Sequence, residues 1–168
     1  MANSVDADRI VLRPARPSDS ASLAALAHEA YGKYLGLVDE PPAPILLDYD
    51  EVASSDRAHV AEEDGRVVGM VTVERDDPHL ILRNLAVRPA CQGLGIGRLL
   101  VAFVEDSARA AGLAGVRLWT RAEMTDNIAF YRRLDYVLTH SERGAGAHRV
   151  FFSKELARTL PTALERTS

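Results

Sequence analysis

Between residues 83 and 100 the chain reads Arg83-Asn84-Leu85-Ala86-Val87-Arg88-Pro89-Ala90-Cys91-Gln92-Gly93-Leu94-Gly95-Ile96-Gly97-Arg98-Leu99-Leu100. The pattern predicts an apolar strand that ends at Arg88-Pro89, then a glycine loop, then an amphipathic helix. The alternating glycines leave the loop backbone bare, so its N–H groups can converge at the start of the helix. Such a helix N-terminus attracts anions, and we therefore expect the loop to bind a phosphate group.

The spacing of the glycines argues against two common nucleotide-binding loops. A dinucleotide fingerprint needs a glycine three positions after its second glycine, where this chain has Arg98. A P-loop needs Gly-Lys-Ser/Thr, whereas this chain has Gly97-Arg98-Leu99. A nucleotide-binding loop is thus disfavoured, and a plain strand-to-helix connection remains the alternative for the glycines alone.

Hydrophobic periodicity and turn residues predict the elements on either side of the loop. Asp64-Gly65 between two apolar runs indicates a tight hairpin. Helices are predicted from the Pro17–Ser20 cap to about Tyr31, once more before Glu51, from the glycine loop to Gly112, and from Asp126 to Leu134 with Thr125 as cap. Strands are predicted at Arg9–Pro14, Ala58–Glu63, Val67–Val73, His79–Val87, Val116–Thr120, Tyr136–His140 and Arg149–Ser153. This order predicts an α+β fold with a mixed, mainly antiparallel sheet of about seven strands and about four helices.

Composition limits the classes of protein that fit. The 168 residues suit a single domain with a core from about 9 to 155 and frayed ends at Met1–Asp8 and Ala157–Ser168. A net charge of −4 disfavours nucleic-acid binding, and no apolar run is long enough to span a membrane. With Cys91 as the single cysteine and a polar start to the chain, we expect a cytoplasmic protein, monomeric or homodimeric. The histidines show no metal-ligand spacing, so no metal is expected.

A second motif lies in the predicted helix after the strand Val116–Thr120. Asn127 and Tyr131 are four residues apart and therefore share one helix face. Gln92, Gly95 and Gly97 form the pattern Gln-x-x-Gly-x-Gly. These two motifs and the order of elements resemble the GNAT superfamily of acetyl-CoA-dependent N-acetyltransferases, from about residue 9 to residue 155. Asp135 stands where that family usually has glycine.

The resemblance implies acetyl-CoA, or coenzyme A, as co-substrate and gives roles to particular residues. Asn127 contacts coenzyme A in that family, and Tyr131 protonates the leaving thiolate. A core tyrosine and a helix-capping asparagine are the alternatives for these two. The strand Leu80–Val87 is expected to separate from the strand Val116–Thr120, and the thioester enters the gap. The residues implied in cofactor binding are Leu85, Ala86 and Val87 at the pantetheine arm and Gln92, Gly93, Leu94, Gly95, Ile96, Gly97 and Arg98 at the pyrophosphate.

The resemblance implies transfer of an acetyl group to a primary amine, by direct attack in a ternary complex. The carboxylate that many relatives use as general base is replaced by Asn84. Glu74, His79 or a water relay are the candidate substitutes. A catalytically silent acyl-CoA-binding or regulatory module is the alternative function. The acceptor can be a small molecule or a peptide, and the acidic residues between Tyr31 and Glu51 favour a cationic amine.

Overall fold

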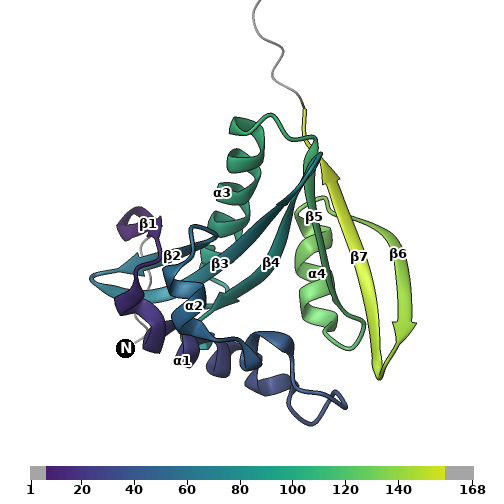
Figure 1. Cartoon of the computed structure of the whole chain (residues 1–168), viewed down its shortest axis with the longest axis horizontal. Coiled ribbons are helices and arrows are strands. Elements are labelled where there is room, and N and C mark those ends of the chain that lie inside the picture. Colours follow the sequence, from purple (N-terminus) through teal and green to yellow (C-terminus); the bar gives the residue numbers. More distant parts are fainter. Residues whose placement is uncertain (1–6, 158–168) are drawn as a thin grey trace, which may run out of the picture.

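A seven-stranded mixed sheet with the order β1-β2-β3-β4-β5-β7-β6 forms the centre of the molecule (Figure 1). The structure is a computed structural model and describes residues 7–157. Its strands are β1 (Ile10–Pro14), β2 (Ala58–Glu63), β3 (Arg66–Asp76), β4 (His79–Val87), β5 (Gly115–Arg121), β6 (Val137–Gly144) and β7 (Ala147–Glu155). Its α-helices are α1 (Ser20–Tyr31), α2 (Tyr49–Ser54), α3 (Ile96–Ala110) and α4 (Thr125–Arg133). The predicted α+β fold is thereby confirmed.

The chain ends and the start of α4 differ in how far they match the prediction. Most of the two ends expected to fray, residues 1–6 and 158–168, lies outside the described residues, while Ala7–Arg9 forms a 3-10 turn. Thr125 was predicted to cap α4, but the N-cap position is Met124 and Thr125 is already helical. The cap prediction was wrong because α4 begins one residue earlier than expected, after Met124, which makes no side-chain cap hydrogen bond.

The helices cover both faces of the sheet. Successive strand residues point to opposite faces, and neighbours such as Met70 and Val71 accordingly belong to different clusters of buried side chains. Met70 packs with residues of α1 and α2, whereas Val71 packs with residues of α3 and with Tyr131 of α4. The pair α1 and α2 therefore covers one face of the sheet, and the pair α3 and α4 covers the other.

The sheet opens in its middle, between β4 and β5. These two strands are parallel, and their register ends after Ile81 opposite Arg117. From Leu82 to Val87, β4 pairs with β3 but has no partner on its other edge within residues 7–157. Figure 1 shows the two strands diverging from their shared end. The predicted separation of these strands is confirmed.

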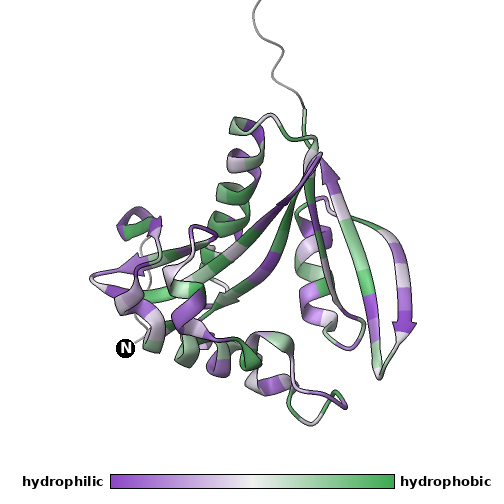
Figure 2. Ribbon diagram, viewed as in Figure 1, coloured by the Kyte–Doolittle hydropathy of each residue, from purple (hydrophilic) through white to green (hydrophobic). Residues whose placement is uncertain are grey.

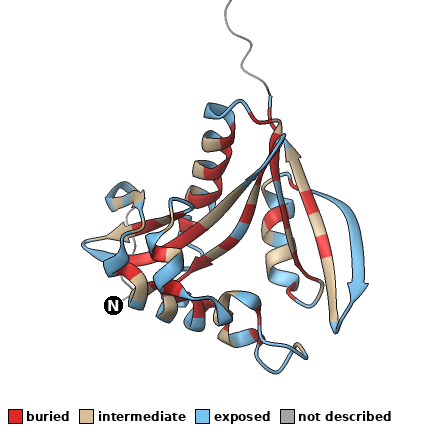
Figure 3. Cartoon of the chain, in the orientation of Figure 1, coloured by how far each residue is buried: buried red, intermediate tan, exposed pale blue. Residues whose placement is uncertain are grey.

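The outer strand β6 contrasts with this centre. Every residue of β6 is exposed, including Val137 and Leu138 (Figure 3). Figure 2 shows apolar residues concentrated on the central strands and on the inner side of α3, while β6 is largely polar. The buried core, and with it any enclosed site, therefore lies around β3, β4, β5 and β7.

A buried ion pair fixes the link between β1 and α1. Both Asp19 carboxylate oxygens accept hydrogen bonds from Arg13, at 2.8 and 2.9 Å, and Asp19 also accepts from the Arg16 N–H at 2.7 Å. These bonds, the one to Arg13 first among them, hold the pKa of Asp19 below its ordinary value although burial opposes this. The carboxylate therefore stabilises the fold most when it is ionised.

We expect Asp19→Asn to lower the free energy of unfolding at pH 7 by roughly 1.5–3 kcal/mol. Because the pKa of Asp19 is lowered in the folded state, its carboxylate adds to the free energy of unfolding above about pH 4, the ordinary carboxyl pKa. This stabilisation is lost as the pH falls through the lowered pKa of the folded protein. Denaturation at pH 7 and at pH 3 measures both effects. Asp77→Asn, which breaks the exposed pair with Arg75, is the control and should change little. If Asp19→Asn lowered the free energy of unfolding as much at pH 3 as at pH 7, the ionised carboxylate would not be the stabilising group.

Candidate functional site

A cavity of about 530 Å³ lies where β4 and β5 separate. Its walls come from the segment between α1 and α2, from strands β3, β4, β5 and β7, and from α4. The cavity brings together five residues that the sequence singled out, which are Glu74, Asn84, Leu85, Asn127 and Tyr131. The shared helix face predicted for Asn127 and Tyr131 thus points to one cavity.

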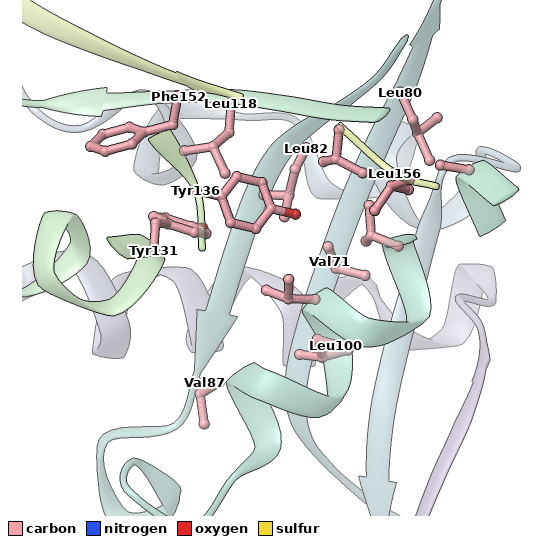
Figure 4. Packing of buried hydrophobic residues seen from close by; sticks show 14 of the residues in the cluster. Val71, Leu80, Leu82, Val87, Leu100, Leu118, Tyr131, Tyr136, Phe152 and Leu156 are labelled. Carbon is pink, nitrogen blue, oxygen red and sulfur yellow. The ribbon is translucent and has the colours of Figure 1, made fainter. Parts of the chain in front are cut away.

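Tyr131 belongs both to this cavity and to the hydrophobic core. It is 6% exposed, and its ring meets Tyr136 and Phe130 edge to face, with centroids 5.7 and 5.1 Å apart. Figure 4 shows the ring of Tyr131 beside that of Tyr136 among the buried side chains. The Tyr131 hydroxyl has no hydrogen-bond partner among the described residues. Burial raises the pKa of Tyr131 well above its ordinary value, so the hydroxyl stays protonated at neutral pH.

Asn84 occupies the position at which a carboxylate was expected, and it is 4% exposed. The Tyr31 hydroxyl donates to Asn84 Oδ1 and to the Leu85 carbonyl oxygen, both at 2.8 Å. This contact orients the carboxamide and leaves Asn84 Nδ2 buried, with no acceptor in residues 7–157. The carboxamide of Asn84 cannot accept a proton from an amine.

The unpaired edge of β4 presents backbone donors. The Arg88 N–H binds the Val68 carbonyl of β3, so by alternation Ala86 also faces β3, while Leu85 and Val87 face the opening. The carbonyls of Leu85 and Val87 are already engaged, by Tyr31 and by Gln92 Nε2 at 3.1 Å. Within residues 7–157, the N–H groups of Leu85 and Val87 have no hydrogen-bond acceptor.

The glycine loop ends in a run of free amides. Within residues 7–157, the backbone N–H groups from Gly93 to Arg98 have no hydrogen-bond acceptor, because the first bond of α3 runs from the Leu99 N–H to the Gly95 carbonyl. Gly93 and Gly95 have positive φ values of 78° and 89°, a conformation that glycine adopts without strain. The loop and the N-terminus of α3 together can bind an anion such as a phosphate.

Gly97 at the start of α3 and Gln92 of the loop make contacts that their sequence motif does not predict. A Cβ on Gly97 would lie 3.2 Å from Cζ of Phe130, so this glycine permits α3 to pack against α4. Gln92 binds the end of β4 through its side chain, as described above, so it positions the loop. Arg98 is exposed at the start of α3.

The two candidate bases differ in location. Glu74 lines the cavity, but it accepts a hydrogen bond from Arg83 at 2.6 Å, and this bond holds the pKa of Glu74 below its ordinary value. His79 does not line the cavity: it lies at the paired end of β4, with Nε2 2.7 Å from Glu155. A water relay, the third alternative, requires neither residue.

Comparison with known proteins places the chain in a family. Residues 23–136 match the model of the acetyltransferase (GNAT) family. The chain belongs to the GNAT family of acetyltransferases. A 108-residue region of this GNAT protein is 34% identical to the IAA acetyltransferase of Azospirillum brasilense, over 62% of this chain and 71% of the relative.

Solved structures of GNAT proteins share the fold at low sequence identity. The ribosomal-protein-S18-alanine N-acetyltransferase of Escherichia coli aligns with a TM-score of 0.71 and 16% identity, over 92% of this chain and 98% of its own. The PaiA N-acetyltransferase of Thermoplasma acidophilum, solved with coenzyme A, aligns with a TM-score of 0.70 and 16% identity, over 88% of this chain and 99% of its own. These matches support the fold.

The site of this GNAT protein includes residues that no motif revealed. Tyr31, Trp119, Arg121 and Arg149 line the cavity, yet the sequence marked none of them as functional. Tyr31 is the last residue of α1, and a tyrosine at a helix end is a weak signal on its own. Within residues 7–157 no group of three or more potential ligands could hold a metal ion, and no helix there is long and apolar enough to span a membrane.

Proposed function

We propose that this protein transfers the acetyl group of acetyl-CoA to a primary amine. The observation that carries the proposal is the run of free N–H groups from Gly93 to Arg98, beside the opening of the sheet. The PaiA relative was solved with coenzyme A, which supports the same type of co-substrate here. The loop would bind the pyrophosphate, with Asn127 as a further contact from α4.

The open edge of β4 suits the rest of coenzyme A. The amide-rich pantetheine arm can accept hydrogen bonds from the N–H groups of Leu85 and Val87 along this edge. An N–H at the same place can also stabilise the oxyanion that forms when the thioester carbonyl is attacked. Ala86 contributes through its pairing with Met70 of β3, which holds the edge in place.

The chemical step is a direct transfer. The neutral amine nitrogen attacks the thioester carbonyl carbon, a C–N bond forms, and the C–S bond breaks with its electron pair on sulfur. Tyr131 then donates its hydroxyl proton to the thiolate, and the proton lost by the amine nitrogen passes to water and from water back to the Tyr131 oxygen, which restores the neutral tyrosine. Tyr131 supports this role because it lines the cavity, its hydroxyl has no hydrogen-bond partner among the described residues, and the hydroxyl is protonated at neutral pH.

We propose that the amine reaches its neutral form through water, without a carboxylate base. Glu74 has a lowered pKa because Arg83 binds it, which makes Glu74 a weak base. His79 lies outside the cavity wall. Asn84 cannot accept the proton, so of the three routes considered from the sequence, Glu74, His79 and water, water is the one we propose.

This route predicts a simple pH dependence. We expect kcat/KM to rise about tenfold per pH unit until the pH approaches the pKa of the amine, about 10 for an alkylamine, because only the neutral amine attacks. Glu74→Gln should leave this slope unchanged. Initial rates between pH 6 and pH 10 measure it. A plateau near neutral pH that Glu74→Gln abolishes would instead make Glu74 the base.

The alternative function is a catalytically silent acyl-CoA-binding module, and Asn84 at the expected carboxylate position is the observation that favours it. Incubation with acetyl-CoA and a panel of primary amines, followed by mass spectrometry, separates the two. An acetylated amine formed faster than in the absence of protein supports the transferase. Thermal protection by coenzyme A without any turnover would support the silent module, and protection by ATP or NAD would favour a nucleotide binder.

A further inference from the structure

Two arginines project from neighbouring strands into the cavity. Arg121 ends β5, and Arg149 lies directly opposite on the antiparallel strand β7. Directly opposed residues of antiparallel strands project from the same face, so the two guanidinium groups share one face of the sheet. Both residues line the cavity. Like charges opposed in this way destabilise a sheet unless an anion compensates them.

Neither guanidinium group has a carboxylate partner in residues 7–157. Arg121 is 8% exposed, and its hydrogen bond goes from Nη1 to the backbone carbonyl of Glu40 at 3.1 Å, which is a neutral acceptor. Arg149 lies over the ring of Trp119, 5.1 Å from its centroid. A charged group buried to this extent normally has an ionic partner. Arg121 therefore lacks the partner that its burial calls for.

The carboxylates that line the cavity do not pair with Arg121 or Arg149. Asp48 accepts from the Asp50 N–H at 3.0 Å and so caps α2, and Glu74 is bound by Arg83. Glu40 and Glu51 are exposed, and among the described residues neither forms an ion pair with the two arginines. Glu142 lies directly opposite Arg149 on β6, but its ion pair is with His140 at 3.4 Å. Within residues 7–157 no carboxylate therefore forms an ion pair with either guanidinium group.

The surroundings of the arginines suit a small organic acid. Trp119 precedes Arg121 by two residues, lies on the same strand face and lines the cavity. The cavity volume, about 530 Å³, lies within the range of small-molecule sites.

We propose that Arg121 and Arg149 bind a carboxylate group carried by the acceptor, so that the acceptor is a small amine with a carboxylate, as in an amino acid. A guanidinium group binds a carboxylate through two parallel N–H donors, and partial burial strengthens the pair. The exposed Glu40 and Glu51 on the same cavity suit the ammonium end of such a molecule. This assignment rests on the proposed acetyl transfer and names its substrate class.

Direct binding tests the subsite without requiring turnover. Calorimetry in saturating coenzyme A would compare N-acetylglycine, N-acetylleucine and N-acetylphenylalanine with their carboxamides. We expect at least one acid to bind roughly 10–100-fold more tightly than its carboxamide, because the amide loses charge-assisted bonds. Equal binding of every acid and carboxamide, or no binding of any, would overturn the assignment.

Substitutions identify the arginines responsible. Arg121→Gln and Arg149→Gln should each reduce the preference for the acid, and together they should abolish it. Arg83→Gln is the matched control, since Arg83 lines the same cavity but is paired with Glu74. It should keep the preference. Unchanged coenzyme A affinity shows that each variant is folded, and a preference that survives the double substitution counts against the arginine pair.

A parallel transfer assay separates this inference from the proposed function. Acetyl-CoA would be supplied with glycine, leucine and phenylalanine and with their carboxamides. Equal acetylation of acids and carboxamides would leave the transferase standing and remove the carboxylate subsite. A binding preference for the acids without acetylation of any amine would retain the anion subsite and remove the transferase.

Discussion

Replacing Tyr131 by phenylalanine is expected to lower kcat by about 10²–10⁴-fold while the fold and the affinity for acetyl-CoA are kept. The substitution removes the hydroxyl and retains the ring, which packs against Phe130 and Tyr136. Because the hydroxyl has no hydrogen-bond partner among residues 7–157, its removal breaks no bond of the folded protein. The measurement is kcat at saturating acetyl-CoA, together with a thermal melt.

Tyr136→Phe is the matched control for this experiment. Tyr136 is a buried neighbour of Tyr131, but its hydroxyl donates to Glu105 at 3.2 Å and is absent from the cavity wall. We expect Tyr136→Phe to cost roughly 0.5–1.5 kcal/mol of stability and to leave kcat near normal. A Tyr131→Phe protein with normal kcat and a lowered melting temperature would return Tyr131 to a purely structural role.

Gly95→Val is expected to weaken coenzyme A binding by about tenfold or more. Gly95 has a φ of 89° at the N-cap of α3, where valine is strained. The loop must shift to relieve that strain, and the N–H groups from Gly93 to Arg98 then lose their common direction. Isothermal titration of coenzyme A into the folded variant measures the loss.

Gly65→Val separates backbone strain from lost binding. Gly65 has a φ of 81° in the β2–β3 hairpin, and an added Cβ meets nothing within 4 Å at Gly65 or at Gly95. Both variants should lose comparable stability, roughly 1–2 kcal/mol, because both force an L-residue into the left-handed region. Only Gly95→Val should lose affinity. If Gly95→Val and Gly65→Val bound coenzyme A with equal affinity, the glycine loop would not be the binding site of the pyrophosphate.

Local signals explain why much of the fold was predictable. The Asp64-Gly65 hairpin follows from residues that tolerate positive φ, and both have it, at 48° and 81°. Asn127 and Tyr131 were placed together because a helix brings positions four apart onto one face, and both line the cavity. Patterns of this kind are complete within a few residues, so the sequence displays them directly.

Contacts between distant parts of the chain account for what the sequence did not reveal. Tyr31 binds Asn84 across 53 positions, and no pattern near either residue signals the partner. The opposition of Arg121 and Arg149 depends on the β5–β7 register, which is set by the packing of the sheet. Asp126, expected only to open α4, instead binds Tyr34 and Lys33 of the segment after α1.

The open edge of β4 also bears on the solubility of the protein. An unpaired strand edge within a sheet is a template on which a strand of another molecule can add and begin aggregation. Here the carbonyls of Leu85 and Val87 already accept hydrogen bonds from Tyr31 and Gln92. An invading strand, which needs both donors and acceptors from its template, would find the acceptors in use. A ligand that mainly requires N–H donors meets no such obstacle, so the same two side chains both protect the edge and select what binds to it.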